Sequence, residues 1–304
     1  MTHLVAAVAG AGADHLLGEP PLPWHPVARY GSMMERVERT TYADRRAAGT
    51  VHLVVGVSTA VGVGIALRRL LGSPAATAVA TFACVAGRML DDEALTIARH
   101  LDANDLPAAR SRLRSLVGRS TEQLDASEIS RAVVESVAEN CVDAVTASLV
   151  WASIGGAPAV LAHRAVNTLD AMVGHRNERY SRFGWASARL DDVVNFLPAR
   201  LTAVAVAVCR PARTAAIARA VRRDAPRHPS PNGGVVEAAF AAALDVRLGG
   251  VNQYGDVRED RGTLGDGRSP QPSDIAAAVS LRRRCTLAVA ALLGVASLSR
   301  RLCS

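Results

Sequence analysis

Apolar segments separated by charged stretches limit the possible folds of this chain more than any other feature. The run "VHLVVGVSTAVGVGIAL" (51–67) contains neither an arginine nor a carboxylate, and Arg68 and Arg69 follow it directly. A helix that crosses a bilayer needs about 20 mostly apolar residues, and basic residues at its end favour the cytoplasmic side. The run therefore predicts a membrane-spanning helix.

The composition agrees with several such segments joined by polar ones. The chain is 49% hydrophobic but only 4% aromatic, and its mean hydropathy is +0.15, which is high for a soluble protein and low for a pure membrane bundle. We expect an all-α fold, a polytopic membrane helical bundle with amphipathic cytoplasmic helices and a polar active-site face, built as a single domain over residues 1–304. Its apolar segments are expected near residues 1–13, 51–70, 73–87, 141–162, 196–209 and 285–299.

The topology of these segments stays open at this point. If 141–162 and 196–209 both cross the membrane, the arginine-rich loop between them faces away from the other polar regions, against the positive-inside rule. Both segments are short and rich in small residues, so a re-entrant or buried arrangement is the alternative. We expect a multi-pass protein of the inner cell membrane whose polar motifs converge on the cytoplasmic face.

The charge excludes several classes of protein. The net charge is +7, and all 35 basic residues are arginine, so a Walker-type phosphate loop and a Schiff-base lysine are both absent. The arginines form no stripe interleaved with aromatic residues, so we expect no nucleic-acid partner. They are expected to flank membrane segments, to contact lipid and to bind anionic groups. The five cysteines lie far apart without a CxxC pair and are predicted to be small buried residues.

The first polar motif is "DHLLGEPPLPWHPVARYG" (14–31). Asp14, Glu19 and His25 stand among four prolines, which predict a rigid loop rather than a helix. Such a loop suits ligand positioning, and a proline-stiffened surface connection is the alternative.

The second motif is "RAVVESVAENCVDAVTA" (131–147). Glu135, Glu139 and Asp143 are four residues apart, which predicts three carboxylates along one helical stripe, with Asn140 at its edge. Like charges at this spacing repel each other, and magnesium is a natural counter-ion because it prefers oxygen ligands. The alternative is a solvated acidic face.

The third motif runs from residue 163 to 200 and predicts two polar helices. His163, Asn167 and Asp170 share one helical face, and Gly174 is expected to end that helix. Such polar density beside membrane segments is costly unless the residues bind a ligand or each other, so a helix pair joined by arginine–carboxylate bridges is the alternative. After Gly174 the motif continues with His175, Arg176, Asn177, Arg179 and Tyr180, and Asp191, Asp192 and Asn195 are expected on a second helix.

The fourth motif is "RHPSPNGGVVEAAFAAAL" (227–244). Asn232 is a good N-cap for the amphipathic helix predicted to follow, and Gly233 and Gly234 allow close backbone approach. A helix N-terminus with free N–H groups attracts anions, and Arg223 and His228 precede the turn. The motif predicts phosphate binding.

Taken in order, these motifs resemble the CobD/CbiB family of cobalamin-biosynthesis membrane proteins over roughly residues 10–265. The resemblance rests on "DHLLGEPPLPWHPVARYG", "VVESVAENCVDAV", "NTLDAMVGHRNERYSRFGWASARLDDVVNFLPARLTA" and "RDAPRHPSPNGGVVEAAFAAALDVRLGG". It implies an adenosylcobinamide-phosphate synthase. Such a ligase uses ATP to join a propionate carboxylate of adenosylcobyric acid, a corrinoid, to (R)-1-amino-2-propanol or its O-phosphate. A homo-oligomer or other cobalamin-assembly enzymes are the expected protein partners.

For this chemistry we assign hypothetical roles to the polar residues. The candidate catalytic residues are Glu139, Asp143, Asp170 and His175. The candidate substrate- and phosphate-binding residues are Asp14, His25, Arg88, Asn140, Asn167, Arg176, Asn177, Arg223, His228, Ser230, Asn232, Gly233 and Gly234. The candidate ligands of a magnesium ion that accompanies ATP are Glu135, Glu139, Asp143, Asp191 and Asp192.

Two other classes of function are compatible with the same features. One is a membrane signalling protein of the β-lactamase-induction regulator type, without synthetase chemistry. The other is a transporter or corrinoid-binding scaffold in which intramembrane carboxylates bind cations. The density of polar groups in the third and fourth motifs favours the enzyme.

Overall fold

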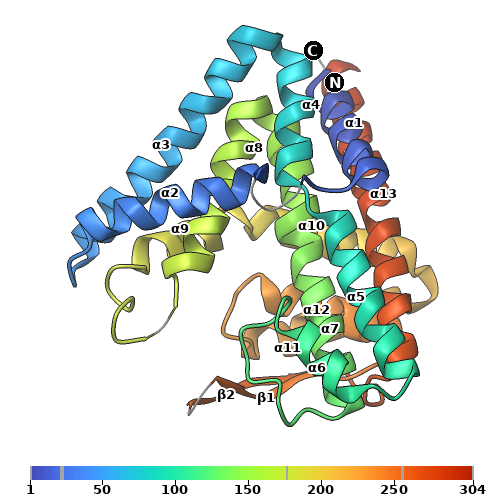
Figure 1. Ribbon diagram of the computed structural model, residues 1–304. Helices are drawn as coiled ribbons and strands as arrows, with labels where there is room; N and C mark the ends of the chain where they lie inside the picture. The colour runs from blue at the N-terminus through green and yellow to red at the C-terminus, as the bar shows by residue number, and fades with distance from the viewer. Residues whose placement is uncertain (1, 21–23, 176, 255–256, 303–304) are drawn as a thin grey trace. The chain divides into compact units, whose positions relative to one another are not determined.

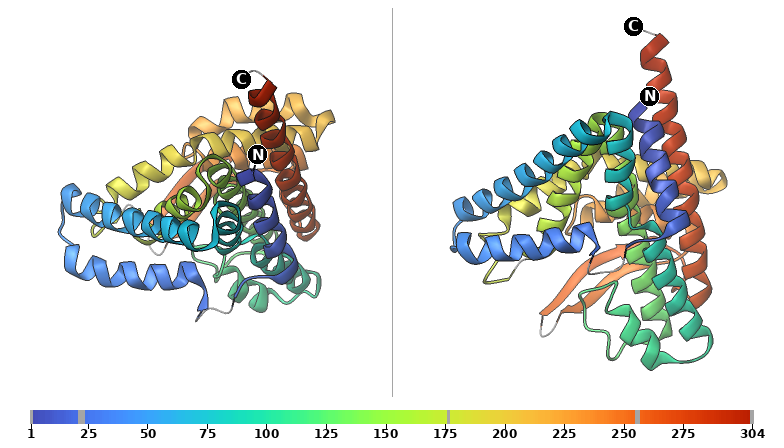
Figure 2. Two further views of the ribbon diagram at one scale, coloured as in Figure 1. Left: turned by 90° about the horizontal axis from the view of Figure 1, so that it is seen from above. Right: turned by 45° about the horizontal axis from the view of Figure 1, so that its top comes forward.

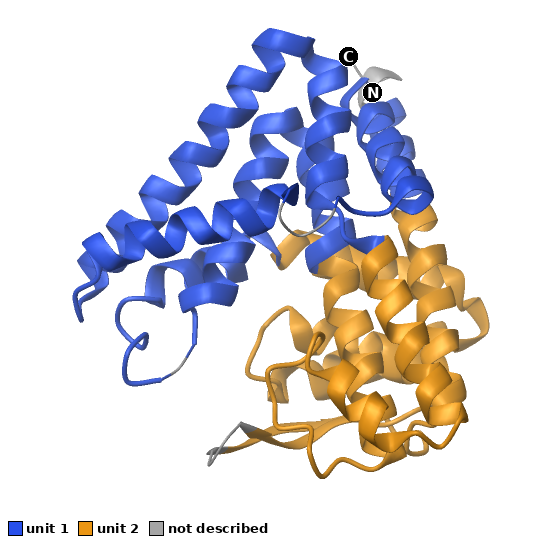
Figure 3. Cartoon of the chain, viewed as in Figure 1, with its two compact units in different colours: residues 1–87, 143–195, 290–304 blue, residues 88–142, 196–289 orange. Residues whose placement is uncertain are grey.

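The computed structural model describes residues 2–20, 24–175, 177–254 and 257–302, and it forms two compact units. Unit 1 comprises residues 1–87, 143–195 and 290–304, and unit 2 comprises residues 88–142 and 196–289 (Figure 3). Each unit is assembled from segments that are distant in the sequence, and the C-terminal helix contributes residues to both. The single domain inferred from the sequence stays a prediction.

Unit 1 is a group of helices packed around one long central helix. Its elements are α1 (Thr2–Leu17), α2 (Pro26–Thr41), α3 (Arg46–Leu71), α4 (Ser73–Cys84), α8 (Ala147–Val173), α9 (Trp185–Val194) and the end of α13 (Pro272–Leu302). Helices α1, α3 and α4 all pack against α8, and α1 runs beside α4 (Figures 1 and 2). Met34, Leu53 and Leu169 join α2, α3 and α8 in a buried apolar cluster. This packing fixes α2 on one side of α3 and α8.

The helix at the centre of unit 1 is bent. Gly156 has a φ of 64° and a ψ of −150°, and Pro158 follows two residues later. Proline lacks the N–H for the helical hydrogen bond, and only glycine adopts this backbone conformation readily. Before the bend, Cys141–Thr146 forms a π-helix rather than an α-helix. The apolar segment 141–162 is therefore not a straight spanning helix.

Unit 2 contains shorter helices and a β-hairpin. Its elements are α5 (Gly87–Asp102), α6 (Leu106–Leu113), α7 (Ala126–Asn140), α10 (Phe196–Cys209), α11 (Thr214–Asp224), α12 (Gly233–Leu244), β1 (Leu248–Tyr254), β2 (Val257–Leu264) and the first part of α13. A capping box starts α7: the Asp125 side chain accepts from the Glu128 amide, and the Glu128 side chain accepts from the Asp125 amide. The cap fixes where α7 begins, and with it the positions of its glutamates.

The hairpin corrects the all-α prediction. Strands β1 and β2 pair antiparallel from Leu248 opposite Leu264, with an irregularity between Gly249 and Val251. Positive-φ glycines at 249, 250 and 262 are poorly suited to a helix interior. The described chain is otherwise mostly helical, as predicted.

Within the part of the chain that the structure describes, two helical stretches are long and apolar enough to cross a bilayer. They are Arg46–Leu71 and the continuous stretch Ala126–Val173, with hydropathies of 1.9 and 1.6, and they contain the segments predicted near 51–70 and 141–162. Trp185–Val194 and Phe196–Cys209 add a third if they form one broken span. Helices α1 and α4 have 16 and 12 residues, fewer than the roughly 20 that a span needs. These helices fit a membrane protein.

Candidate functional site

Unit 2 contains a group of buried and half-buried charged and polar side chains that we call the unit 2 cluster. Its members come from α7, α12, both strands and the loops before α7 and α12, and α12 and the hairpin both contact α7. With 12 residues, α12 is too short to cross a bilayer. The members of the cluster are Arg119, Arg131, Glu135, Glu139, His228, Glu237, Asn252 and Arg261.

Glu135 holds the hairpin against α7. Its carboxylate accepts from the Arg119 guanidinium at 2.6 Å and from the Gly249 amide at 2.8 Å. Arg131 donates to the carbonyl oxygen of the same glycine. Charge-assisted hydrogen bonds of this kind are strong when they are buried, and Glu135 is only 5% exposed. The structure gives Glu135 an architectural role in addition to any contact with a metal.

Glu139 lies one turn further along α7 and lines a cavity of about 110 Å³. Arg119, Asn252 and Arg261 line the same cavity, and Arg119 donates to the Asn252 side-chain oxygen. The cavity is therefore lined by the carboxylate of Glu135, which is bonded to the hairpin, by the carboxylate of Glu139, and by the guanidinium groups of Arg119 and Arg261. This combination can bind a small polar or ionic ligand.

Glu237 on α12 is the member of the cluster that sequence reasoning missed. Its side chain is completely buried, and neither carboxylate oxygen has a hydrogen-bond partner among the residues that the structure describes. Burial raises the pKa of Glu237 well above its usual value, and the nearby charges of Glu135 and Glu139 raise it further. A buried carboxylate without hydrogen bonds is costly, so it is the strongest sign of a functional position in this unit. The only signal in the sequence was a glutamate within the apolar run "GGVVEAAFAAAL".

His228 lies next to Glu237. Its Nε2 atom is 3.4 Å from Glu237 Oε1, and its Nδ1 atom accepts from the Ser230 amide at 3.1 Å. Burial lowers the pKa of His228, which favours the neutral imidazole. His228 of the fourth motif therefore lies beside the Glu237 carboxylate and is not on the surface.

The turn before α12 is closed by its own hydrogen bonds. The Ser230 hydroxyl accepts from the amides of Asn232 and Gly233, whereas Asn232 occupies the N-cap position without a side-chain capping bond. Asn232 is therefore the N-cap residue, as predicted, but the hydroxyl of Ser230, rather than the Asn232 side chain, accepts from the amides at the start of the helix. A Cβ on Gly234 would lie 2.5 Å from the His228 Cβ, so this glycine allows His228 to pack on the helix. A phosphate at this helix end would have to displace Ser230, and phosphate binding there stays a prediction.

The structure brings Arg200, rather than Arg223, to this turn. Arg200 donates to the Asn232 side-chain oxygen at 2.6 Å and to the Pro231 carbonyl at 3.0 Å. Arg223 instead pairs with Asp224 and Asp266, each through two nitrogen–oxygen contacts of 2.6–2.9 Å. Its charge is thus already balanced by two carboxylates, which disfavours the predicted phosphate contact.

The predicted stripe of three carboxylates is not continuous. Glu135 and Glu139 lie on α7, which ends at Asn140, and Asp143 lies within the π-helix that follows. A π-helix makes i→i+5 hydrogen bonds, so the four-residue spacing no longer aligns side chains there. Asn140 donates to the Ser136 carbonyl at 2.9 Å, within its own helix.

Arg88, predicted to bind substrate, donates to Asp92 on the surface of α5 at 3.3 Å.

Unit 1 holds a separate polar network between α8 and α9. Asn195 donates to both Asp191 oxygens at 3.0 and 3.1 Å, and its own oxygen lies 2.8 Å from His163 Nε2. Asn167 reaches Asp191 at 3.5 Å and accepts from Arg164 at 3.3 Å. The third motif thus forms a helix pair joined by polar contacts, but these contacts involve asparagine, aspartate and histidine rather than the arginine–carboxylate bridges of the alternative.

The other residues of this motif surround that network. Asp170 lies in the last turn of α8, which ends at Val173 with Gly174 as its C-cap, so the predicted helix end is confirmed. The Arg189–Asp192 pair is 3.7 Å long on the surface of α9.

The loop after Gly174 is held to α2 by Arg179 and Tyr180 of the third motif. Arg179 and the Tyr180 hydroxyl donate to Glu38 at 2.9 and 3.0 Å, and the Asn177 side chain accepts from the Tyr180 amide at 2.9 Å. His175 lies with its ring 6.5 Å from that of Tyr180. Asn177 therefore stabilises the loop, and Arg176 lies outside the described residues.

The first motif is partly helical, contrary to the loop that its prolines predicted. Asp14 is buried within α1, and the helix continues to Leu17. The chain leaves it before the prolines, and Glu19 pairs with His25 Nε2 at 2.8 Å. His25 is the N-cap residue of α2, so this pair fixes the start of that helix.

The predicted residues therefore fall into two groups. The candidates in unit 2 are Arg88, Glu135, Glu139, Asn140, Arg223, His228, Ser230, Asn232, Gly233 and Gly234. The described candidates in unit 1 are Asp14, His25, Asp143, Asn167, Asp170, His175, Asn177, Asp191 and Asp192. Among the described residues, no three histidine, cysteine or acidic side chains form a group that could hold a metal ion. A magnesium ion bound mainly by phosphate and water needs only one or two carboxylates, and Glu139 fits that requirement. A single pocket that unites both groups stays a prediction.

The apolar helices and the unit 2 cluster define a largely helical chain that fits a membrane protein with a buried polar site. The chain matches the family described as CobD/Cbib protein over residues 7–282. It is 48% identical to the cobalamin biosynthesis protein CobD of Mycobacterium tuberculosis over 99% of this chain and 97% of that protein. It is 38% identical to the protein of the same name from Rhodobacter capsulatus over 97% of this chain and 98% of that protein.

These matches cover nearly the whole chain at high identity. The protein of the same name from Halalkalibacterium halodurans is 38% identical over 94% of this chain and 93% of its own length. No solved structure matches the chain. The chain belongs to the CobD/CbiB family of cobalamin biosynthesis proteins.

Proposed function

We propose that the chain is an ATP-dependent acid–amine ligase of cobalamin biosynthesis. It joins a propionate carboxylate of adenosylcobyric acid to the amine of (R)-1-amino-2-propanol or of its O-phosphate, which gives adenosylcobinamide or its phosphate. Family membership and the names of the relatives support the pathway. The observation that carries the proposed chemistry is Glu237, a fully buried carboxylate without a hydrogen bond among the described residues.

The first step must activate a carboxylate, which is a poor electrophile. Transfer of the terminal phosphoryl group of ATP to the propionate oxygen would give an acyl phosphate and ADP. Such transfer depends on positioning and on positive charge near the phosphates. Arg119 and Arg261, which line the same cavity as Glu139, are suitable sources of that charge. Magnesium, when bound, would neutralise phosphate charge, and Glu139 would be its protein ligand.

The second step needs a neutral amine. An alkylamine is mostly protonated at neutral pH, because its pKa lies near that of a lysine side chain. Glu237 suits such an amine, because a buried carboxylate with a raised pKa both attracts an ammonium ion and accepts its proton. The amine nitrogen then forms the amide bond, and inorganic phosphate leaves. We add Glu237 to the candidate catalytic residues Glu139, Asp143, Asp170 and His175.

The location that fits this proposal is the cell membrane, with the polar site open to the cytoplasm, where ATP is available. The competing signalling function finds no support among the relatives named above, which are all cobalamin biosynthesis proteins. A corrinoid-binding scaffold would bind the corrinoid without converting it. The reaction itself distinguishes these functions.

The test is reconstitution with purified full-length protein in detergent. Adenosylcobyric acid, ATP, magnesium and either aminopropanol or its phosphate are supplied, and each is left out in turn. We expect a corrinoid amide, detected by mass spectrometry, with one ADP formed per amide. Corrinoid binding without amide formation with either amine would reject the ligase in favour of a scaffold.

A further inference from the structure

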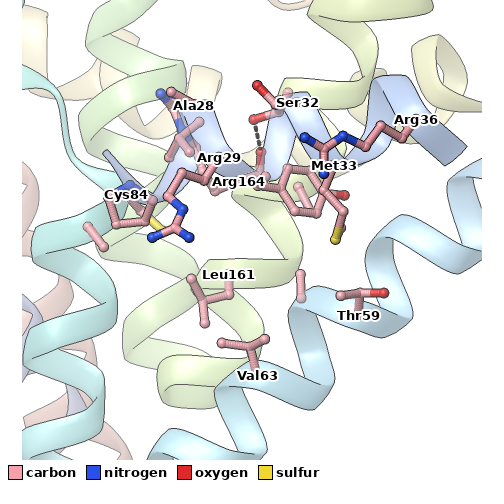
Figure 4. Close-up of a pocket in the computed structure, with 17 residues that line it drawn as sticks. Ala28, Arg29, Ser32, Met33, Arg36, Thr59, Val63, Cys84, Leu161 and Arg164 are labelled. Carbon is pink, nitrogen blue, oxygen red and sulfur yellow. Dashed lines mark hydrogen bonds between the residues drawn. The ribbon is translucent and has the colours of Figure 1, made fainter. Parts of the chain in front are cut away.

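Unit 1 contains a large pocket that none of the roles above uses. It has a volume of about 660 Å³, within the range of small-molecule sites, and it is bounded by α2, α3, α4 and α8 (Figure 4). Arg29, Arg36 and Arg164 gather on one side, opposite Val63 and Leu161. The pocket therefore has a cationic side and an apolar side.

The arginines of this pocket have few partners in the described structure. Arg164 donates to Asn167 at 3.3 Å through one terminal nitrogen, and its buried Nε atom has no hydrogen-bond partner among the described residues. No acidic residue is among the described residues that line the pocket, and the structure records no ion pair to Arg29 or Arg36. By contrast, Arg179 and Arg182 of the same unit each pair with a carboxylate.

The lining of the pocket also includes part of a candidate membrane-spanning helix. Thr59, Ala60 and Val63 of its lining lie in the middle of α3, one of the helices long and apolar enough to cross a bilayer. Cations at membrane depth are expensive and usually face a cavity or a binding partner. One phosphate group could contact all three guanidinium groups, and guanidinium groups bind phosphate oxygens through paired hydrogen bonds.

We propose that this pocket binds the phosphate group of an amphipathic ligand, with the phosphate at Arg29, Arg36 and Arg164 and the apolar part against Val63 and Leu161. A phosphorylated metabolite and the headgroup of an anionic phospholipid share this chemistry. The proposal does not rest on the proposed reaction, because it concerns unit 1 and is tested by binding alone.

The experiment measures binding to purified full-length protein in a neutral detergent at low salt. Phenyl phosphate represents the soluble source, with phenol as its uncharged counterpart. Dihexanoyl phosphatidylglycerol represents the lipid source, with dihexanoyl phosphatidylcholine as its zwitterionic counterpart. Affinity is obtained from the rise in unfolding temperature with probe concentration and from equilibrium dialysis.

We expect at least one anionic probe to bind and its counterpart to bind much more weakly. The Arg29→Gln/Arg36→Gln double variant and the Arg164→Gln variant should each weaken that binding about tenfold or more. Arg39→Gln is the matched control, because Arg39 lies on the same helix as Arg29 and Arg36 but does not line the pocket.

Each outcome decides the proposal. Binding of phenyl phosphate alone identifies a soluble phosphorylated ligand, binding of phosphatidylglycerol alone identifies a lipid headgroup, and binding of both supports the shared chemistry. If Arg164→Gln does not fold, the double variant on the exposed side of α2 decides. Failure of both anionic probes to bind, or equal weakening by Arg39→Gln, overturns the proposal.

Discussion

His228 Nε2 lies 3.4 Å from Glu237 Oε1 inside unit 2, and both side chains are buried. Burial lowers the pKa of the histidine and raises that of the glutamate, so the surroundings oppose charge on both groups. The pair lies at the start of α12, next to the closed turn at Ser230. A buried carboxyl group such as that of Glu237 lowers the stability of the fold when it is charged, and its raised pKa suits it to proton transfer.

The first prediction concerns the stability cost of Glu237. A carboxyl group whose pKa is raised on folding binds its proton more tightly in the folded state. It therefore destabilises the fold increasingly as the pH rises above the unfolded value of 4.5. Glu237→Gln should raise the unfolding temperature by roughly 2–4 °C at pH 8. The exposed Glu122→Gln serves as the control, and an unfolding temperature for Glu237→Gln equal to or below that of the unaltered protein would argue against a strained carboxylate.

The second prediction concerns a buried ion pair in unit 2. Asp91 accepts from Arg282 at 2.6 and 2.7 Å and from Arg283 at 2.7 Å, and Asp91 and Arg282 are both buried. Replacing Asp91 by Asn leaves a buried guanidinium without its counter-charge, which typically costs about 3–5 kcal/mol. The neighbouring Asp92→Asn should cost less than about 1 kcal/mol, because Asp92 forms only an exposed pair. Chemical unfolding in detergent measures the free energy of unfolding of both variants. A similar loss of free energy in Asp91→Asn and Asp92→Asn would contradict the prediction.

The third prediction concerns acid stability. Hydrogen bonds from Arg223, and then from the Gly265 amide, lower the pKa of the buried Asp224 below its usual 3.8. A carboxyl group with a depressed folded pKa stabilises the fold above its unfolded pKa, and this contribution is lost as the pH falls through the folded pKa. Below about pH 4, the unfolding temperature of the unaltered protein should therefore fall more steeply with falling pH than that of the Asp224→Asn variant. Asp245→Asn removes an exposed carboxylate and should keep the steep fall.

The sequence predicted much of the helical architecture and less of the site. Helices at 46–71 and 147–173 follow from their long apolar runs, and the helix end at Gly174 was predicted correctly. The π-helix at Cys141–Thr146 shifts Asp143 out of the stripe of Glu135 and Glu139, and residue spacing alone cannot show this shift.

The missed residues share a physical reason. Glu237 stands within an alanine- and valine-rich helix, where one acidic residue shows no pattern until the packing buries it. Arg200 donates a hydrogen bond to Asn232, which is 32 residues away in the sequence. Glu135 accepts one from Gly249, which is 114 residues away. Such contacts are set by how helices pack, which local propensity does not determine.

The fourth prediction separates two neighbouring carboxylates of α7. Glu139 lines the small cavity, whereas Glu135 holds the hairpin through Arg119 and Gly249. Glu139→Gln should require roughly tenfold more magnesium for half-maximal activity without loss of stability. Glu135→Gln should lower the unfolding temperature instead. An unchanged magnesium requirement in Glu139→Gln would remove it as a metal ligand.

The most direct measurement is the rate of amide formation by Glu237→Gln at saturating ATP, adenosylcobyric acid and aminopropanol phosphate. A general base contributes about 10²–10⁴-fold to a rate, so we expect kcat to fall at least about 100-fold while the protein stays folded. Glu122→Gln should retain the rate of the unaltered protein. A Glu237→Gln variant that forms the amide at the unaltered rate would show that this carboxylate takes no part in the reaction.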